Sequence, residues 1–151
     1  MHKITPFLWY NGQIEEAITL YTSAFGNSKV LSTSPGPGGS LMSATIEIEE
    51  QHLIIFNGGP VYELSPAVSL LVNCETQEEV DRLWTKLSDG GSESRCGWLV
   101  DRFGLSWQII PSILPTLLQD PDREKAGRVM TAMLAMAKID IAALERAAAG
   151  R

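Results

Sequence analysis

The feature that most constrains the fold of this chain is an internal repeat. Similar residues recur after 62 residues at the first matched position (73 − 11) and after 63 at the others (78 − 15 and 84 − 21). A repeat of this length is too long for a solenoid unit and indicates a duplicated half-domain. The matched positions are Asn11 with Asn73, the pair Glu15-Glu16 with Glu78-Glu79, and Tyr21 with Trp84.

The first half of the chain is predicted to form a strand, a helix and three further strands. Residues Lys3 to Tyr10 alternate and are rich in aromatic side chains, which predicts a strand. Helical spacing follows until Gly26-Asn27, with an apolar face of Ile14, Ala17, Ile18, Tyr21 and Phe25. The other strands are predicted at residues 29–33, 41–49 and 52–56, with a loop at 34–40 and a stop at 57–60.

The second half repeats this order. A strand is predicted at residues 67–73, and Thr76 with Glu79 forms a capping-box pattern at the start of a helix. Two short strands follow near residues 97–100 and 105–110, joined by a tight turn through 101–104. The predicted apolar face of the helix consists of Val80, Leu83, Trp84 and Leu87.

Beyond Pro111 the pattern becomes helical. Residues 113–118 predict a short turn, Asp120-Pro121 predicts an N-cap with proline at the first helical position, and Asp140 predicts the cap of a last helix. The apolar face between them either packs onto the sheet or a second subunit, or forms an adaptable binding surface. Its residues are Val129, Met130, Met133, Leu134 and Ala137.

Charge and cysteine content exclude several classes of partner. The formal net charge is −6, and the 12 basic residues are scattered, so no basic stripe exists for nucleic acid. No apolar run approaches the roughly 20 residues that span a bilayer. The two cysteines, Cys74 and Cys96, form no metal-binding motif, and they favour a reducing, cytoplasmic location over a disulfide framework.

Five long strings of the sequence point to a known family: ITPFLWYNGQIEEAITLYTSAFGNSKV, FNGGP, VNCETQEEVDRLW, CGWLVDRFGLSWQIIP and MLAMAKIDIAALERA. They resemble the PhnB-like family of the vicinal-oxygen-chelate superfamily, which includes glyoxalases and bleomycin-resistance proteins. The resemblance implies an α+β fold in which two βαβββ modules form curved, barrel-like mixed sheets, followed by C-terminal helices. We expect a single domain over residues 1–151, with modules at 1–60 and 65–111 and a helical extension at 112–151.

The same resemblance implies a homodimer, because many relatives build a complete cleft from modules of both subunits. Members of this family often carry the label of a demethylubiquinone methyltransferase. A Rossmann-type methyltransferase needs a glycine-rich turn between a strand and a helix. The glycine clusters at 36–39, 58–59 and 90–91 do not have this context, so S-adenosylmethionine binding of that type is excluded.

Metal-using relatives hold a divalent ion with inward-facing His or Glu residues on the first and fourth strands of each module. The corresponding positions here are Pro6, Ala67 or Ser69, residues 55–57 and Gln108. One neutral amide cannot offset the hydration that a divalent ion loses. We therefore predict no metal and no other cofactor, and we assign His52 to a solvated or capping role rather than to a ligand set.

A concave sheet surface without a metal still offers a small-molecule site, because pockets are mostly apolar with a few placed polar groups. By alternation, the inward face carries Ser106 and Ile110 beside the candidates. Two of the candidates have an alternative role: Asn57 as a turn residue and Cys96 as an inert thiol. The three tryptophans at 9, 84 and 107 are expected to face the helices. The candidate ligand-binding residues are Gln108, Ser69, Asn57, Cys96 and Trp98.

Three functions remain open from the sequence. The first is a small-molecule-binding protein with a metal-free cleft in a homodimer, whose ligand is unknown and for which no catalytic residue is assigned. The second is a metal-dependent lyase, isomerase or dioxygenase that uses displaced ligands such as His52, Glu47 or Glu63. The third is a scaffold whose dimer surface and C-terminal helices bind another protein.

Overall fold

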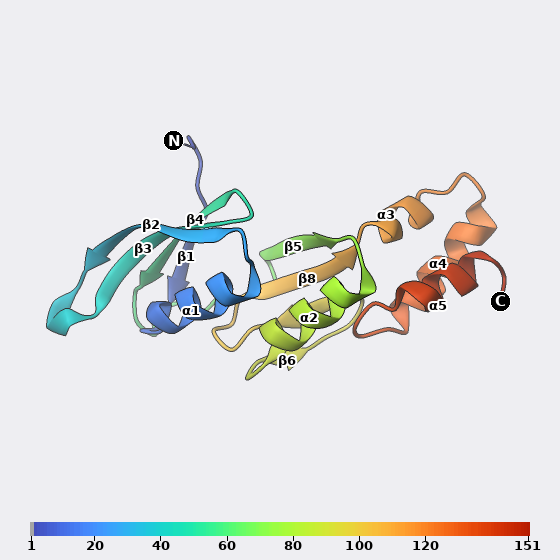
Figure 1. The fold of residues 1–151 in the computed structure, drawn as a ribbon. Coiled ribbons are helices and arrows are strands. Elements are labelled where there is room, and N and C mark those ends of the chain that lie inside the picture. The colour runs from blue at the N-terminus through green and yellow to red at the C-terminus, as the bar shows by residue number, and fades with distance from the viewer. Residues whose placement is uncertain (1) are drawn as a thin grey trace. The chain divides into compact units, whose positions relative to one another are not determined.

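The structure is a computed structural model that describes residues 2–151. It divides into two compact units, Met1–Ser65 and Pro66–Arg151. Each unit contains one four-stranded mixed sheet and a helix that follows its first strand (Figure 1). The α+β class and the duplicated βαβββ order, which the family resemblance implies, are therefore confirmed. Within residues 2–151, no helix is long and apolar enough to cross a membrane.

The first unit has the sheet order β1-β4-β3-β2. Strand β1 pairs in parallel with β4, and the other two pairings are antiparallel. A short 3-10 turn, Pro37–Gly39, joins β2 to β3. The elements are β1 (Phe7–Tyr10), α1 (Ile14–Ala24), β2 (Ser28–Pro35), β3 (Leu41–Ile48) and β4 (Gln51–Asn57).

The second unit repeats this arrangement with the sheet order β5-β8-β7-β6. Its first strand again pairs in parallel with its last, β5 with β8. The shared strand order explains the sequence repeat, because each half must bury its own helix, α1 or α2, against a sheet of the same topology. The elements are β5 (Ser69–Cys74), α2 (Gln77–Ser88), β6 (Ser92–Glu93), β7 (Trp98–Val100) and β8 (Ser106–Pro111).

Helices α1 and α2 bury the apolar faces that their spacing predicts. All four predicted residues of α2 are buried, whereas in α1 Leu20 and Ala24 are buried and Ile18 is only half-buried. The matched Tyr21 and Trp84 are both buried, each at the eighth position of its helix. The Thr76 hydroxyl accepts the Glu79 N–H at 3.2 Å, as the capping box predicts.

Several strand boundaries differ from the prediction. Strand β1 begins at Phe7 rather than at residue 3, because β4 pairs with it only from Ile54 onward. Strand β2 extends to Pro35, and β5 begins at Ser69 rather than at residue 67. The two-residue strand β6 was not predicted, since so short a segment carries no alternation pattern.

The second unit continues into three helices, α3 (Ile113–Leu118), α4 (Arg123–Leu134) and α5 (Ile141–Ala148), which we call the C-terminal extension together with their connections. The extension packs around Ile110 at the end of β8. On α4, Val129 is buried, but Met130 and Leu134 are exposed and Ala137 lies beyond the helix. The buried residues of this core are Ile110, Leu114, Val129, Ile139 and Leu144.

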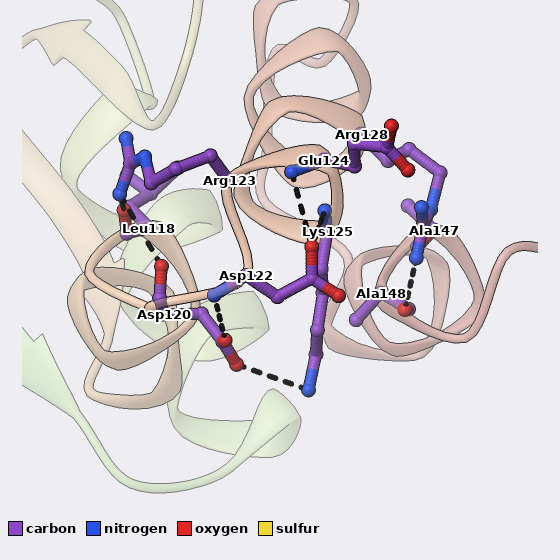
Figure 2. Close-up of polar contacts among 9 residues, drawn as sticks. All are labelled: Leu118, Asp120, Asp122, Arg123, Glu124, Lys125, Arg128, Ala147 and Ala148. Atoms are coloured by element: carbon purple, nitrogen blue, oxygen red, sulfur yellow. Dashed lines mark hydrogen bonds and ion pairs between the residues drawn. The ribbon is translucent and has the colours of Figure 1, made fainter.

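The N-cap of α4 is Asp122, which corrects the prediction of Asp120. The Asp122 carboxylate accepts the N–H groups of Glu124 and Lys125 at 3.1 and 3.3 Å (Figure 2). The Asp120 carboxylate instead accepts the Asp122 N–H at 2.9 Å and pairs with Lys125 at 3.1 Å. Asp120 thus holds the turn before the helix, and Pro121 lies in that turn. The predicted cap of α5 is confirmed, since Asp140 accepts the Ala143 N–H at 3.1 Å.

Polar contacts hold the extension against the sheet and against α2. The N–H groups of Cys96 and Gly97 donate to the carbonyls of Met136 and Ala137, both at 2.8 Å. Gln77 on α2 donates to the Ile139 carbonyl at 2.9 Å, and its side-chain oxygen accepts the N–H of Ile141 at 2.8 Å. Beside it, Lys138 pairs with Asp81 at 2.8 Å.

Candidate functional site

Most of the predicted site residues lie on the sheet of the second unit, on the face opposite α2. Leu99, Trp107 and Ile109 are buried on the α2 side, so alternation places Gln108 on the other face. The Gln108 side-chain nitrogen donates to the Ser69 hydroxyl oxygen at 3.0 Å. The structure therefore brings together two candidates that are 39 residues apart in the sequence.

Ser106 shares this face with Gln108, two residues earlier on β8, and pairs in register with Ser69. Its side chain is fully buried, and its hydroxyl has no hydrogen-bond partner among the described residues. A buried hydroxyl without a partner is unfavourable by about 1–3 kcal/mol, so each such group requires an explanation. We call Ser69, Ser106 and Gln108 the polar face of the second sheet.

Trp98 and Cys96 lie near this face but differ in role. Trp98 is half-buried and pairs in register with Gln108 across β7 and β8. Cys96 precedes that strand in a left-handed conformation, φ 59°, and its N–H is engaged by the extension. At Gly97 the backbone has a φ of 84° and a Cβ atom would lie 2.9 Å from the Ile109 carbonyl oxygen, so this position requires glycine.

The thiol of Cys74 is not a candidate nucleophile. Cys74 is fully buried on the α2 side of β5. Burial, with a smaller contribution from the Glu79 carboxylate, raises the pKa of this thiol to about 12. Since the thiolate is the reactive form, Cys74 is inert at neutral pH.

Asn57 belongs to the first unit, at the end of β4. Its side-chain oxygen accepts the N–H of Ile14 at 3.2 Å, and its side-chain nitrogen donates to the Leu41 carbonyl at 2.9 Å. Gln13, the residue before α1, provides no side-chain cap. Asn57 therefore caps α1 from a position 43 residues away in the sequence. This role is structural, as is the alternative role of a turn residue. Contact of Asn57 with a ligand stays a prediction.

The first sheet carries an aromatic cluster on the face opposite α1, and this corrects the expected position of Trp9. Leu8 and Tyr10 are buried on the α1 side, so alternation places Trp9 on the other face. Its ring contacts Phe56 and Tyr62 edge to face, at centroid distances of 5.1 and 5.0 Å. Its indole N–H donates to the Gly59 carbonyl at 2.9 Å.

Phe7 completes the aromatic cluster, 5.4 Å from Phe56 between ring centroids. Sequence reasoning missed the cluster, although the alternation of Phe7 to Tyr10 contained the signal. Trp9 was expected to face the helix, whereas the strand period places Phe7 and Trp9 together on the outer face. By contrast, Trp84 and Trp107 lie in the core as predicted.

Two of the proposed displaced metal ligands meet in the first unit. His52 Nε2 lies 2.8 Å from a Glu47 carboxylate oxygen, and Lys29 pairs with Glu47 at 3.7 Å. The hydrogen bond from His52, followed by the charge of Lys29, holds the pKa of Glu47 below its usual value. Glu63 has no recorded contact with this pair.

The donor atoms at the superfamily's metal positions do not fit a divalent ion. Pro6 offers no side-chain donor, Ile55 is buried, and the Gln108 amide is engaged with Ser69. Within residues 2–151, no group of three or more His, Cys, Asp or Glu side chains is placed to hold a metal ion. We therefore derive no chemistry through a metal.

The glycine clusters do not build a phosphate- or dinucleotide-binding turn. Residues 36–39 join β2 to β3, and residues 90–91 follow α2. At Gly58 a Cβ atom would lie 2.1 Å from the Trp9 indole, so this glycine allows the backbone to cross the ring. None of the three clusters opens an α-helix after a strand, as the sequence predicted; the cluster at 36–39 forms only the short 3-10 turn.

Comparisons with known proteins agree with this fold. A family described as 3-demethylubiquinone-9 3-methyltransferase matches residues 2–110. The PhnB protein of Bacillus cereus is 32% identical with a TM-score of 0.69, over 74% of this chain and 100% of that protein. Protein PA1353 of Pseudomonas aeruginosa is 25% identical with a TM-score of 0.60, over 74% and 98% of the two chains.

A more distant match shows the fold alone. The fosfomycin resistance protein FosX of Listeria monocytogenes, solved with Mn(II) and sulfate, is 16% identical with a TM-score of 0.52, over 71% of this chain and 90% of that protein. No curated protein matches the sequence. The family match ends at residue 110, so the C-terminal extension lies outside it.

Proposed function

This chain belongs to the family described as 3-demethylubiquinone-9 3-methyltransferase, the PhnB-like branch of the vicinal-oxygen-chelate superfamily, and we propose that it binds a small organic molecule without a metal ion. The observation that carries the proposal is the hydrogen bond between Gln108 and Ser69 on the face opposite α2. It places two polar groups among apolar neighbours on a partly accessible sheet face, and ligand sites have this composition.

The substitution at Gln108 supports binding rather than metal chemistry. The resemblance places Gln108 where metal-using relatives carry a glutamate. An amide offers one donor group and one acceptor and carries no charge, so it orients a ligand but holds a divalent ion poorly. Because the Ser69 hydroxyl fixes the amide at 3.0 Å, the side chain is ordered before a ligand arrives.

The aromatic cluster of the first unit supports the same proposal. Phe7 and Tyr62 are 57% and 64% exposed, although large aromatic side chains are usually covered. Exposed aromatic groups that gather on one face mark binding surfaces more often than isolated ones do. Their rings provide a rigid apolar contact for a flat ligand.

We also propose that the protein is a cytoplasmic homodimer, with clefts that combine modules of both subunits. Two free cysteines fit a reducing compartment. Light scattering after size exclusion tests the assembly, and a mass twice that of the 16.5 kDa chain supports it. A monomeric mass at micromolar concentration contradicts the dimer.

A fragment screen by nuclear magnetic resonance tests the binding function directly. We expect some fragments to shift the Gln108 side-chain amide and Trp98 indole signals, and Gln108→Ala to weaken their binding at least about tenfold. Gln119→Ala, an exposed glutamine after α3, is the matched control. A library in which no fragment shifts the Gln108 amide contradicts the proposal.

Elemental analysis of the purified protein tests the absence of a metal. We expect a metal content far below one ion per chain, also after incubation with zinc, nickel, manganese or iron. A near-stoichiometric ion contradicts the metal-free site and favours the alternative of a metal-dependent lyase, isomerase or dioxygenase. Loss of that ion in His52→Ala or Glu47→Ala then locates it at the pair described above.

A second candidate function, binding of another protein, is favoured by one observation. Met130 and Leu134 are 41% and 55% exposed and lie one turn apart on α4. Stable co-purification of a different protein, lost in a Met130→Ser and Leu134→Ser double variant, supports this function.

A further inference from the structure

We propose that the polar face of the second sheet selects ligands with an uncharged oxygen acceptor, such as a ketone or amide carbonyl, and that the Ser106 hydroxyl donates to that acceptor. The inference rests on the proposed function and names the class of ligand. It comes from three properties of the face: its unused hydrogen-bond donors, its lack of ionisable side chains and its flanking aromatic ring.

The first property is the state of Ser106. Its hydroxyl is fully buried, and no described residue provides it with a partner. Buried polar groups in folded proteins are nearly always paired, and the exceptions mark functional groups or places for an additional molecule. Ser106 lies two residues before Gln108 on the same strand and opposite Ser69, so a partner for it approaches from the polar face. Because the hydroxyl has no exposed surface, a ligand contacts it only when the groups that cover it move aside.

Hydrogen-bond accounting then gives the chemistry of the missing partner. The Ser69 oxygen already accepts from Gln108, which leaves the Ser69 proton to donate. Ser69 and Ser106 together provide two hydroxyl protons without a recorded acceptor. A carbonyl oxygen has two lone pairs and accepts two such bonds, whereas an amine or an alkyl group leaves at least one proton unpaired.

The second property is charge. The strands β5, β7 and β8 contain one ionisable side chain, Cys74, and it is buried on the α2 side. An anion on the polar face would lose hydration without an ion partner, which is far less favourable than burying a carbonyl group. The face is therefore built for a neutral acceptor rather than for a carboxylate, a phosphonate or a sulfate.

The third property is the ring of Trp98. It is half-buried and pairs in register with Gln108, so it borders the polar face on the β7 side. Aromatic groups pack well against the flat surface of an indole. The ligand class that fits all three properties is a neutral carbonyl attached to a flat apolar group.

Four probes of nearly equal size separate these properties: benzamide, acetophenone, benzoate and phenylphosphonate. Each is titrated into the 151-residue protein while the Gln108 amide and Trp98 indole signals are followed. We expect the two neutral probes to bind at least about tenfold more tightly than the two anions, a difference of about 1.4 kcal/mol. Equal or tighter binding of either anion overturns the inference, and so does the binding of none of the four.

The variant Ser106→Ala separates a ligand contact from a structural hydroxyl. We expect it to weaken acetophenone binding about tenfold while the melting temperature of the free protein stays equal or rises, because an unpaired buried hydroxyl is removed. Ser94→Ala, at an exposed serine before β7, is the control and changes neither value. Unchanged acetophenone binding in Ser106→Ala overturns the inference, as does a melting temperature lowered by several degrees.

The outcomes distinguish this inference from the function beneath it. If anionic probes alone shift the Gln108 signals, a small molecule binds and the choice of a neutral acceptor is wrong. If no fragment and no probe shifts these signals, both proposals are wrong.

Discussion

The two units have the same strand order but opposite chemistry on the faces that their helices leave uncovered. The face of the first sheet carries an aromatic cluster and the hydrogen-bonded pair of Glu47 and His52. The face of the second sheet carries two serines and a glutamine without charge. The helix side of each sheet must bury an apolar helix and stays similar, whereas the outer face is free to acquire different binding groups.

The segment after the last strand shows the same contrast. In the first unit, the short segment after β4 crosses the ring of Trp9. Gly58 of this segment lies against the Trp9 ring, and Tyr62 contacts the same ring edge to face. In the second unit the C-terminal extension packs around Ile110. Phe56 and Ile110 are each the penultimate residue of their strand, so both segments cover the same place in their own sheet.

The largest expected effect concerns the turn before β8, the last strand of the second unit. Asp101 is buried and accepts the N–H groups of Phe103 and Leu105 and the Trp107 indole, at 2.9, 3.0 and 2.9 Å. We expect Asp101→Ala to lower the free energy of unfolding by about 3 kcal/mol, because two buried donors and one partly buried donor lose this acceptor. Urea denaturation measures the change. Asp89→Ala, at an exposed aspartate after α2, is the control, and a loss below about 1 kcal/mol contradicts the assignment.

A second test compares how the two helices begin. Helix α1 is capped by the distant Asn57, which also holds Leu41, and α2 is capped by the adjacent Thr76. We expect Asn57→Ala to destabilise the protein by about 2 kcal/mol and Thr76→Ala by about 1 kcal/mol, since the first removes two bonds and the second one. Denaturation of both variants under the same conditions ranks them. Equal losses would mean that the bond from Asn57 to Leu41 adds no stability.

A smaller effect is expected where the first unit has its own turn before the last strand. Glu49 and Glu50 adopt left-handed conformations there, with φ of 46° and 69°. Glycine adopts this region without the steric penalty of a Cβ atom, so Glu50→Gly should raise the free energy of unfolding by about 0.5–1 kcal/mol. Thermal unfolding monitored by circular dichroism is sensitive enough. Glu63→Gly, at an exposed position where left-handed geometry is not recorded, should not raise stability.

The smallest expected effect is the pH dependence of the contact between α2 and the extension. Hydrogen bonds from Lys138 and Gln77 hold the pKa of Asp81 below its ordinary value. The native state therefore binds fewer protons than the unfolded state, so this stabilisation is present above the unfolded pKa and is lost as pH falls through the folded pKa.

Because Asp81 and Lys138 are half exposed, we expect this contribution to be only a few tenths of a kcal/mol. Unfolding free energies at pH 7 and pH 3 measure it, and Asp81→Asn should reduce the difference between them slightly. The first unit provides the matched case, because Glu47 also has a lowered pKa and Glu47→Gln should act in the same direction. An increase of the difference in either variant would contradict the sign.

The sequence predicts the fold well because the repeat, the helical faces and the capping box are local patterns with strong periods. The shared face of Gln108 and Ser69 was also predicted, since it follows from strand alternation, whereas their contact depends on the register of β5 with β8. The role of Asn57 could not, because its partners are 43 and 16 residues away in the sequence. The position of Trp9 was predictable from its strand, because the period of two places it on the face opposite Leu8 and Tyr10, and the prediction that it faces the helix was wrong.

The hydrogen bonds that attach the C-terminal extension to Cys96 and Gly97 use main-chain groups only, and this affects how the extension tolerates amino-acid substitutions. Every residue type presents the same carbonyl to a neighbouring N–H, so the identities of residues 136 and 137 do not determine these two bonds. Side chains on the outer surface of the C-terminal extension are thus free to vary while these two main-chain hydrogen bonds persist. The C-terminal extension is a part of the molecule in which mutations can change surface properties at little risk to folding.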